Sequence, residues 1–329
     1  MSEPTDGAVL GDLAETDILA RIFPRLPGAA AAIVGPGDDA AVVTAADGRF
    51  VVTTDMMIHG PDFRLAWSTP YELGWKAAAT NLSDVAAMGA RPSALVVALA
   101  APADWPVAAV ESFADGLREA CDALAPGCGV VGGDLSVSPV LTIAITAFGD
   151  LEGRTPVLRS GARDGDVVAH AGRRGAAARG LRLLFTEGVD ADGHPDAERT
   201  ARLRREQPLA LAAQLAPEPP ISSGVDAATA GATAMLDVSD GLARDARRIA
   251  EASGVRIDFD SAALGDDPVF ALGGGEDHGL LATFPPGAAI PDGFRVLGLV
   301  VDGTGVSVDG TAIDPAGWDP YSGWDGSAG

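Results

Sequence analysis

The sequence predicts an α/β (α+β) protein of two domains, in which mixed sheets are flanked by helices. Its 329 residues and 47% hydrophobic content are enough for a sizeable core. Short apolar runs typical of strands are interspersed with helical runs in both halves. Because the pattern restarts near residues 149–153, we expect one domain at residues 1–150 and a second at 151–329.

In the first half, residues 17–23 predict a short amphipathic helix, and residues 50–54 a strand that ends at Asp55. Residues 69–72 (Thr-Pro-Tyr-Glu) are a strong helix start, with an N-cap Thr, a Pro in the first turn and Glu at the third position. We expect this helix to stop at Gly89. The other predicted elements here are segments 30–34 and 40–43 around a Gly-Pro-Gly-Asp-Asp turn, strands at 93–100 and 141–148, and a helix at 106–124.

In the second half, residues 233–236 predict a strand that ends at Asp237, followed by a helix that opens at Ser239-Asp240. The polar stretch 188–198 has no periodicity and predicts a loop. The remaining predicted elements are strands at 166–171, 255–259, 280–284 and 294–301, helices at 176–185 and 199–215, and a hairpin around 305–311.

Composition excludes several classes of function. A formal charge of −23 and a pI near 4.3 argue against nucleic acid as a partner. The spacing of Cys121 and Cys128 fits neither a disulfide framework nor a zinc site. The longest apolar run, residues 94–101, is far short of the roughly 20 residues that span a bilayer. The acidic N-terminus lacks the features of a signal peptide, so we expect a cytoplasmic protein that does not bind membranes.

The most informative feature is a set of Gly- and Thr-flanked acids, most of which terminate or interrupt apolar runs. Two carboxylates about 4 Å apart repel each other by roughly 4 kcal/mol at an effective dielectric constant near 20. Divalent cations remove that cost, and carboxylate, hydroxyl and carbonyl oxygens select Mg²⁺, which is readily shared with phosphates. The chain therefore predicts a site for several metal ions and a polyphosphate. The motifs are Gly37-Asp38-Asp39, Thr53-Thr54-Asp55, Asn81-Leu82-Ser83-Asp84, Gly132-Gly133-Asp134, Asp237-Val238-Ser239-Asp240-Gly241 and Gly274-Gly275-Glu276-Asp277.

Other nucleotide and metal motifs fit less well. A P-loop sequence is absent, and the sole lysine, Lys76, falls within a predicted helix. Residues 35–40 match the dinucleotide fingerprint weakly, with two acids where a pyrophosphate would lie. Residues 190–193 resemble part of a calcium loop but lack its bidentate Glu. Arg159 precedes a turn, and is either a phosphate clamp or a surface ion pair.

Taken in order, these motifs, together with Leu158-Arg159-Ser160-Gly161-Ala162, resemble the signature of thiamine-monophosphate kinases. Those enzymes belong to the superfamily of aminoimidazole ribonucleotide synthetase. The resemblance covers nearly the whole chain. It implies that fold, ATP-dependent phosphorylation of thiamine monophosphate to thiamine diphosphate, and a homodimer whose N-terminal halves pair. It also implies an active-site cleft to which both domains contribute.

The resemblance further implies roles for individual residues. Several Mg²⁺ ions would be held by Asp39, Thr53, Thr54, Asp55, Asp84, Asp134, Asp237 and Asp240. ATP, the co-substrate, would be bound by Gly133, Asp134, Arg159 and Ser239, and the thiamine portion by Glu276 and Trp318. Two positions depart from the family pattern: Asp62-Phe63 stands where His-Phe is usual, and His278-Gly279 where Tyr-Glu is usual.

These residues suit direct in-line transfer without a covalent or general-base residue, because the acceptor phosphate is largely dianionic near neutral pH. Two other functions remain open. One is an aminoimidazole ribonucleotide synthetase-like ligase, and the other is a nucleotide sensor that binds ATP without transfer. A selenophosphate synthetase would carry an N-terminal Cys motif and the hydrogenase-maturation relative a C-terminal Cys, but both cysteines lie mid-chain.

Overall fold

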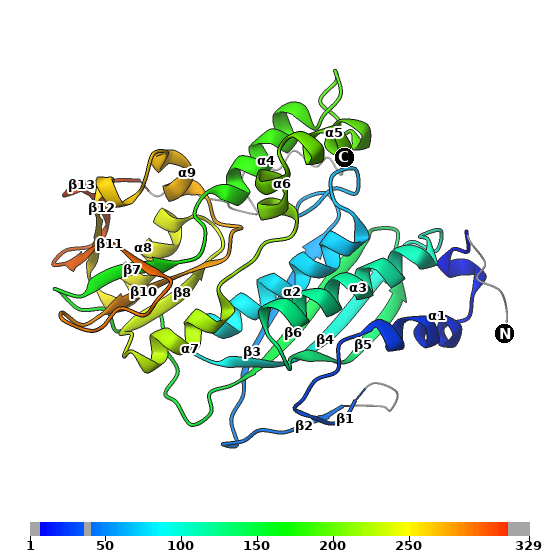
Figure 1. The fold of residues 1–329 in the computed structure, drawn as a ribbon, viewed down its shortest axis with the longest axis horizontal. Coiled ribbons are helices and arrows are strands. Elements are labelled where there is room, and N and C mark those ends of the chain that lie inside the picture. The colour runs from blue at the N-terminus through cyan, green and yellow to red at the C-terminus, as the bar shows by residue number, and fades with distance from the viewer. Residues whose placement is uncertain (1–6, 36–40, 315–329) are drawn as a thin grey trace.

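The computed structural model describes residues 7–35 and 41–314. Within them the strands form a four-stranded sheet in the N-terminal half, a seven-stranded sheet in the C-terminal half, and a small pair, β1 (Ala32–Val34) with β2 (Val42–Val43). Helices flank both large sheets (Figure 1). The predicted fold class, mixed α/β with helix-flanked mixed sheets, is confirmed.

The four-stranded sheet has the order β3 (Val51–Ile58), β6 (Thr142–Asp150), β4 (Arg91–Ala101), β5 (Gly129–Val137). The β4–β5 pair is parallel and the other two pairs are antiparallel. Helices α2 (Pro70–Ala87) and α3 (Val107–Leu124) lie along one face of the sheet (Figure 1). On that face Ile143, Ile145 and Ala147 are buried, so the strand alternation of β6 supplies the floor of the N-terminal core.

Helix α2 begins and ends as its sequence predicts. The Thr69 hydroxyl accepts the backbone N–H of Glu72 while the Glu72 carboxylate accepts that of Thr69, which is a capping box. Gly89, at φ +73°, follows the helix. Gly74 packs α2 onto α3 backbone to backbone, since a Cβ there would lie 2.1 Å from the carbonyl oxygen of Phe113.

The seven-stranded sheet has the order β13-β12-β9-β11-β7-β10-β8. Its strands are β7 (Val167–Ala171), β8 (Ala234–Val238), β9 (Arg256–Phe259), β10 (Gly279–Phe284), β11 (Phe294–Val301), β12 (Gly305–Val308) and β13 (Thr311–Ala312). The remaining helices are α1 (Glu15–Ile22), α4 (Ala176–Glu187), α5 (Ala197–Glu206), α6 (Pro208–Leu215), α7 (Ile221–Thr229), α8 (Leu242–Ser253) and α9 (Pro268–Gly273), with short 3-10 turns at Leu10–Asp12, Phe23–Arg25 and Ser261–Ala263.

Helix α2 connects the two halves. One hydrophobic cluster includes Leu82 of α2, Ile145 of the first sheet, and Met235 and Leu280 of the second. The helix also contacts α7, β8 and β10. The sheets change between β6 and β7, close to the boundary we expect at residue 150. Because one core spans both halves, that boundary stays a prediction.

Several predicted elements differ from the structure. The helix expected at 199–215 is two helices, because Pro208 has no N–H to continue α5 and instead begins α6. Strand β3 continues past Asp55 to Ile58, and the Gly132-Gly133-Asp134 segment lies inside β5. The sequence patterns did not predict α7 or α9. None of the described helices has both the length and the hydropathy to cross a membrane.

Candidate active site

Four of the predicted acids converge on one pocket of about 520 Å³. Asp55 comes from the middle of β3, Asp84 from the last turns of α2, Asp237 from the end of β8, and Asp240 from the turn that follows. The Thr53 hydroxyl donates to Asp84 at 2.8 Å, and the Asn81 side chain accepts the backbone N–H of Asp55 at 3.1 Å. Motifs up to 185 residues apart in sequence therefore supply a single carboxylate cluster.

The electrostatics of this cluster disfavour its ionised form. Burial raises the pKa of Asp55, and the charges of Asp237 and Asp240 add to the effect. Burial, followed by the charges of Asp237 and Asp55, raises the pKa of Asp84 to about 7. The donors are carboxylate and hydroxyl oxygens, the ligand set that suits Mg²⁺. These residues fit a magnesium site, since divalent cations would restore the ionised carboxylates that burial disfavours.

His278 lies against the same acids, at the position where the sequence departs from the family pattern. Its Nδ1 is 3.3 Å from Asp237 Oδ2, and its Nε2 is 3.4 Å from the Thr80 hydroxyl. The residue is only 4% exposed. Burial alone would lower the pKa of His278, but its hydrogen bond to Asp237 and the charges of Asp237 and Glu276 raise it. The imidazole therefore takes up a proton more readily than an ordinary histidine at the acidic end of the pocket.

A buried acid fixes the turn that carries Asp240. Asp245, fully buried in α8, accepts the backbone N–H groups of Asp240 at 3.0 Å and Gly241 at 3.2 Å. Arg248 bridges Asp245 and Asp240, with its Nη2 2.5 Å from Asp240. Gly241 has φ +131°, a conformation that L side chains rarely adopt. The sequence predicted that the helix would open at Ser239, but it begins at Leu242.

A second group of charges lies further along the pocket. Lys76 of α2 donates to Glu276 Oε1 at 2.7 Å, and Gln214 of α6 donates to Oε2 at 2.5 Å. Burial would raise the pKa of Glu276, but the charge of Lys76 and the hydrogen bonds from Lys76 and Gln214 lower it. Asp62 also lines the pocket and accepts the backbone N–H of Ile58 at 2.7 Å.

Aromatic side chains form another part of the lining. Trp67 and Phe185 meet edge to face at 4.8 Å between ring centroids, and the guanidinium of Arg64 lies 4.8 Å and 5.0 Å from their rings. Phe63 is also part of this wall. Sequence reasoning missed these residues, together with Lys76, Thr80 and Gln214. One signal was available: Lys76, Thr80 and Asp84 recur every four residues along α2, a polar stripe on an otherwise apolar helix.

The structure does not bring every predicted residue to the cluster. Arg159, Ser239 and Glu276 line the pocket. Thr54 points to the opposite face of β3 from Thr53 and Asp55, because strand side chains alternate, and its hydroxyl donates to the carbonyl of Ile145. Asp39 and Trp318 lie outside the described residues.

Gly133 and Asp134 are also separated from the other acids. Asp55 lies level with Ile145, Val97 and Gly133 across the sheet, so Gly133 is three strand spacings away, about 14 Å. Asp134 pairs with Ala98 and lies on the face of the sheet opposite Asp55. The sequence did not reveal this because β3 and β5 become the two outer strands only when the sheet assembles.

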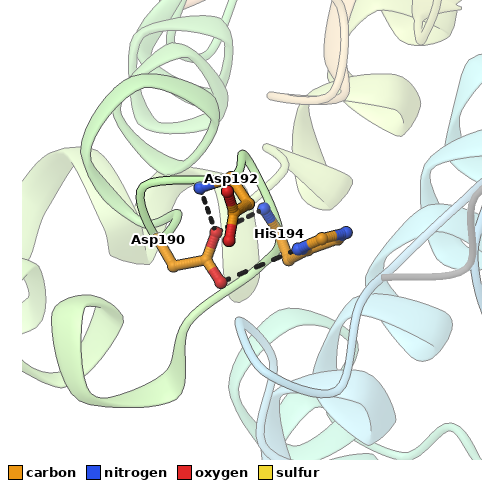
Figure 2. A group of neighbouring side chains, drawn as sticks. All are labelled: Asp190, Asp192 and His194. Carbon is orange, nitrogen blue, oxygen red and sulfur yellow. Dashed lines mark hydrogen bonds and ion pairs between the residues drawn. The ribbon is translucent and has the colours of Figure 1, made fainter.

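A different acidic group lies in the loop between α4 and α5. Asp190, Asp192 and His194 are all exposed and place one potential ligand atom each within 4.8 Å of the others (Figure 2). Asp190 accepts the backbone N–H groups of Asp192 and His194, both at 2.9 Å. Hydrogen bonds from His194 and Asp192 lower the pKa of Asp190. Backbone donors thus already stabilise this carboxylate.

Comparisons with known proteins identify the family of the chain. Residues 37–151 match the family model "AIR synthase related protein, N-terminal domain". A thiamine-monophosphate kinase of Mycobacterium tuberculosis is 44% identical over 336 aligned residues, which cover 97% of this chain and 93% of that protein. The chain belongs to the thiamine-monophosphate kinase family.

Two solved structures of family members have the same fold. Thiamine-monophosphate kinase from Stenotrophomonas maltophilia K279a is 31% identical to the chain, with a TM-score of 0.75, over 92% of this chain and 98% of that one. The structure of AaThiL complexed with AMPPCP and TMP is 34% identical, with a TM-score of 0.68, over 85% of this chain and 90% of that one. This protein is therefore an enzyme of that kinase family, with the fold that the sequence motifs predicted.

Proposed function

We propose that the protein transfers the terminal phosphoryl group of ATP to thiamine monophosphate and so forms thiamine diphosphate. The observation that carries this proposal is the convergence of Asp55, Asp84, Asp237 and Asp240 on one pocket. Membership of the thiamine-monophosphate kinase family supports it. So does the related structure complexed with AMPPCP and TMP, because one homologous fold holds both an adenine nucleotide and the acceptor named there.

The four clustered carboxylates would hold the magnesium ions. When bound, those ions neutralise the phosphates and align them for transfer. Thr53 hydrogen bonds to Asp84 and would orient that carboxylate. Asn81 and Asp245 fix the backbone at Asp55 and Asp240, so these ligands are positioned before any substrate enters.

Other pocket residues would bind the two substrates. Arg159 and Ser239 lie where they can contact the nucleotide, and Glu276 is placed for the thiamine portion. Trp318, beyond the described residues, is proposed for the thiamine portion as well. The second phosphate pKa is about 6, so near neutral pH the acceptor is itself a nucleophile. We expect direct in-line transfer and no phosphoenzyme.

We also propose a homodimer formed through the outer face of the four-stranded sheet. The face opposite α2 and α3 exposes Val52 (60%) and Met56 (59%), an apolar pair that is costly to leave in water. Asp134 lies on the same face, on the outer strand β5. Sedimentation of wild type and of Met56→Arg tests this proposal, because a dimer should dissociate in the variant.

The function is tested by incubating purified protein with thiamine monophosphate, ATP and Mg²⁺. We expect thiamine diphosphate and ADP in equal amounts. ATP binding in calorimetry without product would favour the nucleotide sensor. Turnover of formylglycinamidine ribonucleotide, the substrate of aminoimidazole ribonucleotide synthetase, would favour the ligase. Protein labelled covalently by γ-labelled ATP would contradict direct transfer.

A further inference from the structure

Lys76 is unusual in this sequence. The chain contains 23 lysines and arginines, and Lys76 is the only lysine, which leaves 22 arginines (23 − 1). The basic residues of the chain are thus all arginines except at position 76. That position is buried in the middle of α2, with the side chain 9% exposed, and it lines the pocket. The one lysine of the chain thus lies in the pocket rather than on an exposed surface.

Lysine and arginine side chains differ in how they bind a carboxylate. An arginine presents a planar fork that binds both oxygens of a carboxylate, whereas a lysine ammonium is a compact point charge. The same helix shows the contrast. One turn before Lys76, Glu72 is bound through both oxygens by the Nη1 and Nη2 atoms of Arg204. Lys76 instead donates to Oε1 of Glu276, and Gln214 donates to Oε2.

This difference determines what Glu276 can offer a ligand. Each carboxylate oxygen of Glu276 accepts one hydrogen bond and keeps a free lone pair. The side chain is 35% exposed and lines the pocket. Burial would favour the protonated acid, but Lys76 and Gln214 keep the pKa of Glu276 low, so it is charged at neutral pH. An arginine fork at position 76 would neutralise the carboxylate equally well but would occupy both oxygens.

We propose that Lys76 is a positioning residue for acceptor recognition, which holds Glu276 ionised and open so that the pocket selects an acceptor with a cationic ring. The inference rests on the proposed function, in which the acceptor is thiamine monophosphate, whose thiazolium ring carries a permanent positive charge. Asp62 lines the same pocket and reinforces the preference for a cation. 4-Methyl-5-(2-phosphooxyethyl)thiazole carries the same phosphate arm on a neutral ring and lacks the aminopyrimidine, so its affinity relative to thiamine monophosphate is compared between variants rather than taken alone.

The test compares wild type with Lys76→Arg and Glu276→Gln. Steady-state kinetics give KM for thiamine monophosphate and for ATP, and calorimetry gives the affinity ratio of thiamine monophosphate to the uncharged thiazole phosphate. For Lys76→Arg we expect about a 10-fold rise in acceptor KM and a similar fall in that ratio. The KM for ATP and the unfolding temperature should stay near wild type. Glu276→Gln should reduce the ratio equally. Arg21→Lys, at the Arg21–Glu111 pair near the N-terminus, controls for the exchange itself.

Each outcome decides the inference. If wild type phosphorylates thiamine monophosphate and Lys76→Arg keeps the wild-type acceptor KM and ratio, the inference is wrong and the proposed function stands. If Lys76→Arg raises both KM values together, its role is structural. If Lys76→Arg does not fold, Glu276→Gln decides, because an unchanged ratio there overturns the inference. If wild type neither binds nor phosphorylates thiamine monophosphate, both proposals are wrong.

Discussion

The molecule contains two groups of acidic residues with opposite properties. The pocket cluster is assembled from β3, α2 and the end of β8, and burial raises the pKa of Asp55 and of Asp84. The loop group of Asp190, Asp192 and His194 comes from five consecutive residues, is exposed, and has a lowered pKa at Asp190. Short ligand spacing alone does not make a site. Instead, the distinguishing feature is the energetic cost of keeping buried, neighbouring carboxylates ionised, which a bound cation would remove.

The largest expected effect is at the pocket ligands. Asp55→Ala or Asp240→Ala should reduce turnover by at least about 100-fold, because removing even a group that supports a metal ligand costs 10–100-fold. Both variants should keep the wild-type fold, since burial and neighbouring charges disfavour the ionised Asp55 in the absence of metal and Asp245 fixes the turn that carries Asp240. Steady-state ADP release and far-UV circular dichroism measure the two effects. Wild-type-like rates in both variants would contradict the magnesium assignment.

The next effect concerns stability against pH. The folded-state pKa of Asp84, about 7, lies above the usual aspartate value of 3.8, so between these values the folded protein binds more protons than the unfolded chain. Metal-free protein should therefore lose stability as pH rises from about 4 to about 7, with a slope of up to about 1.4 kcal/mol per pH unit from this group. Thermal unfolding with and without Mg²⁺ measures this.

Asp84→Asn is the matched control for that experiment. The variant cannot titrate at this position, so its metal-free stability should vary less with pH and should exceed that of wild type at pH 7. Saturating Mg²⁺ should make the stability of wild type vary less with pH, because bound metal keeps the carboxylates ionised. A metal-free wild type that becomes more stable between pH 4 and pH 7 would refute the raised pKa.

A smaller effect is expected at Asp245, which shapes the cluster without lining the pocket. Asp245→Asn should lower turnover about 10-fold and raise the Mg²⁺ concentration needed for half-maximal rate, because its two backbone acceptor bonds and its pairing with Arg248 would be disturbed. Magnesium titrations of the rate measure the shift. A fall in rate at unchanged magnesium dependence would show that the residue supports only the fold.

Local signals predicted some parts of the molecule well. The bounds of α2 follow from its capping box and from Gly89, both of which depend on neighbouring residues alone. The motifs around Asp84 and Asp237 indicated the cluster because each acid sits at the end of a regular element. Thr54 was assigned to the site by the family resemblance, which carries over a motif but not the direction of each side chain. In the longer strand the alternation turns Thr54 away.

The other features of the site depend on contacts between residues far apart in the sequence. A local sequence pattern does not specify such contacts. The distance from Asp55 to Asp134 depends on β6 and β4 inserting between β3 and β5. The contact of Lys76 with Glu276 joins residues 200 positions apart. That pairing requires the second sheet to pack against α2, and the apolar residues that drive the packing do not specify which polar side chains will meet.

The smallest expected effect is at the loop group, and it tests the comparison directly. Asp190→Asn with Asp192→Asn should change turnover by less than about 2-fold and leave the unfolding temperature near that of wild type, because exposed carboxylates that cap their own loop contribute little. Calorimetric titrations of calcium or magnesium into wild type and into this double variant should give indistinguishable heats of binding. If the double variant lost a binding event or more than half of its activity, exposure and backbone hydrogen bonding would no longer separate a solvated acidic loop from a metal site. The criterion drawn from the pocket would then have to rest on ligand geometry alone.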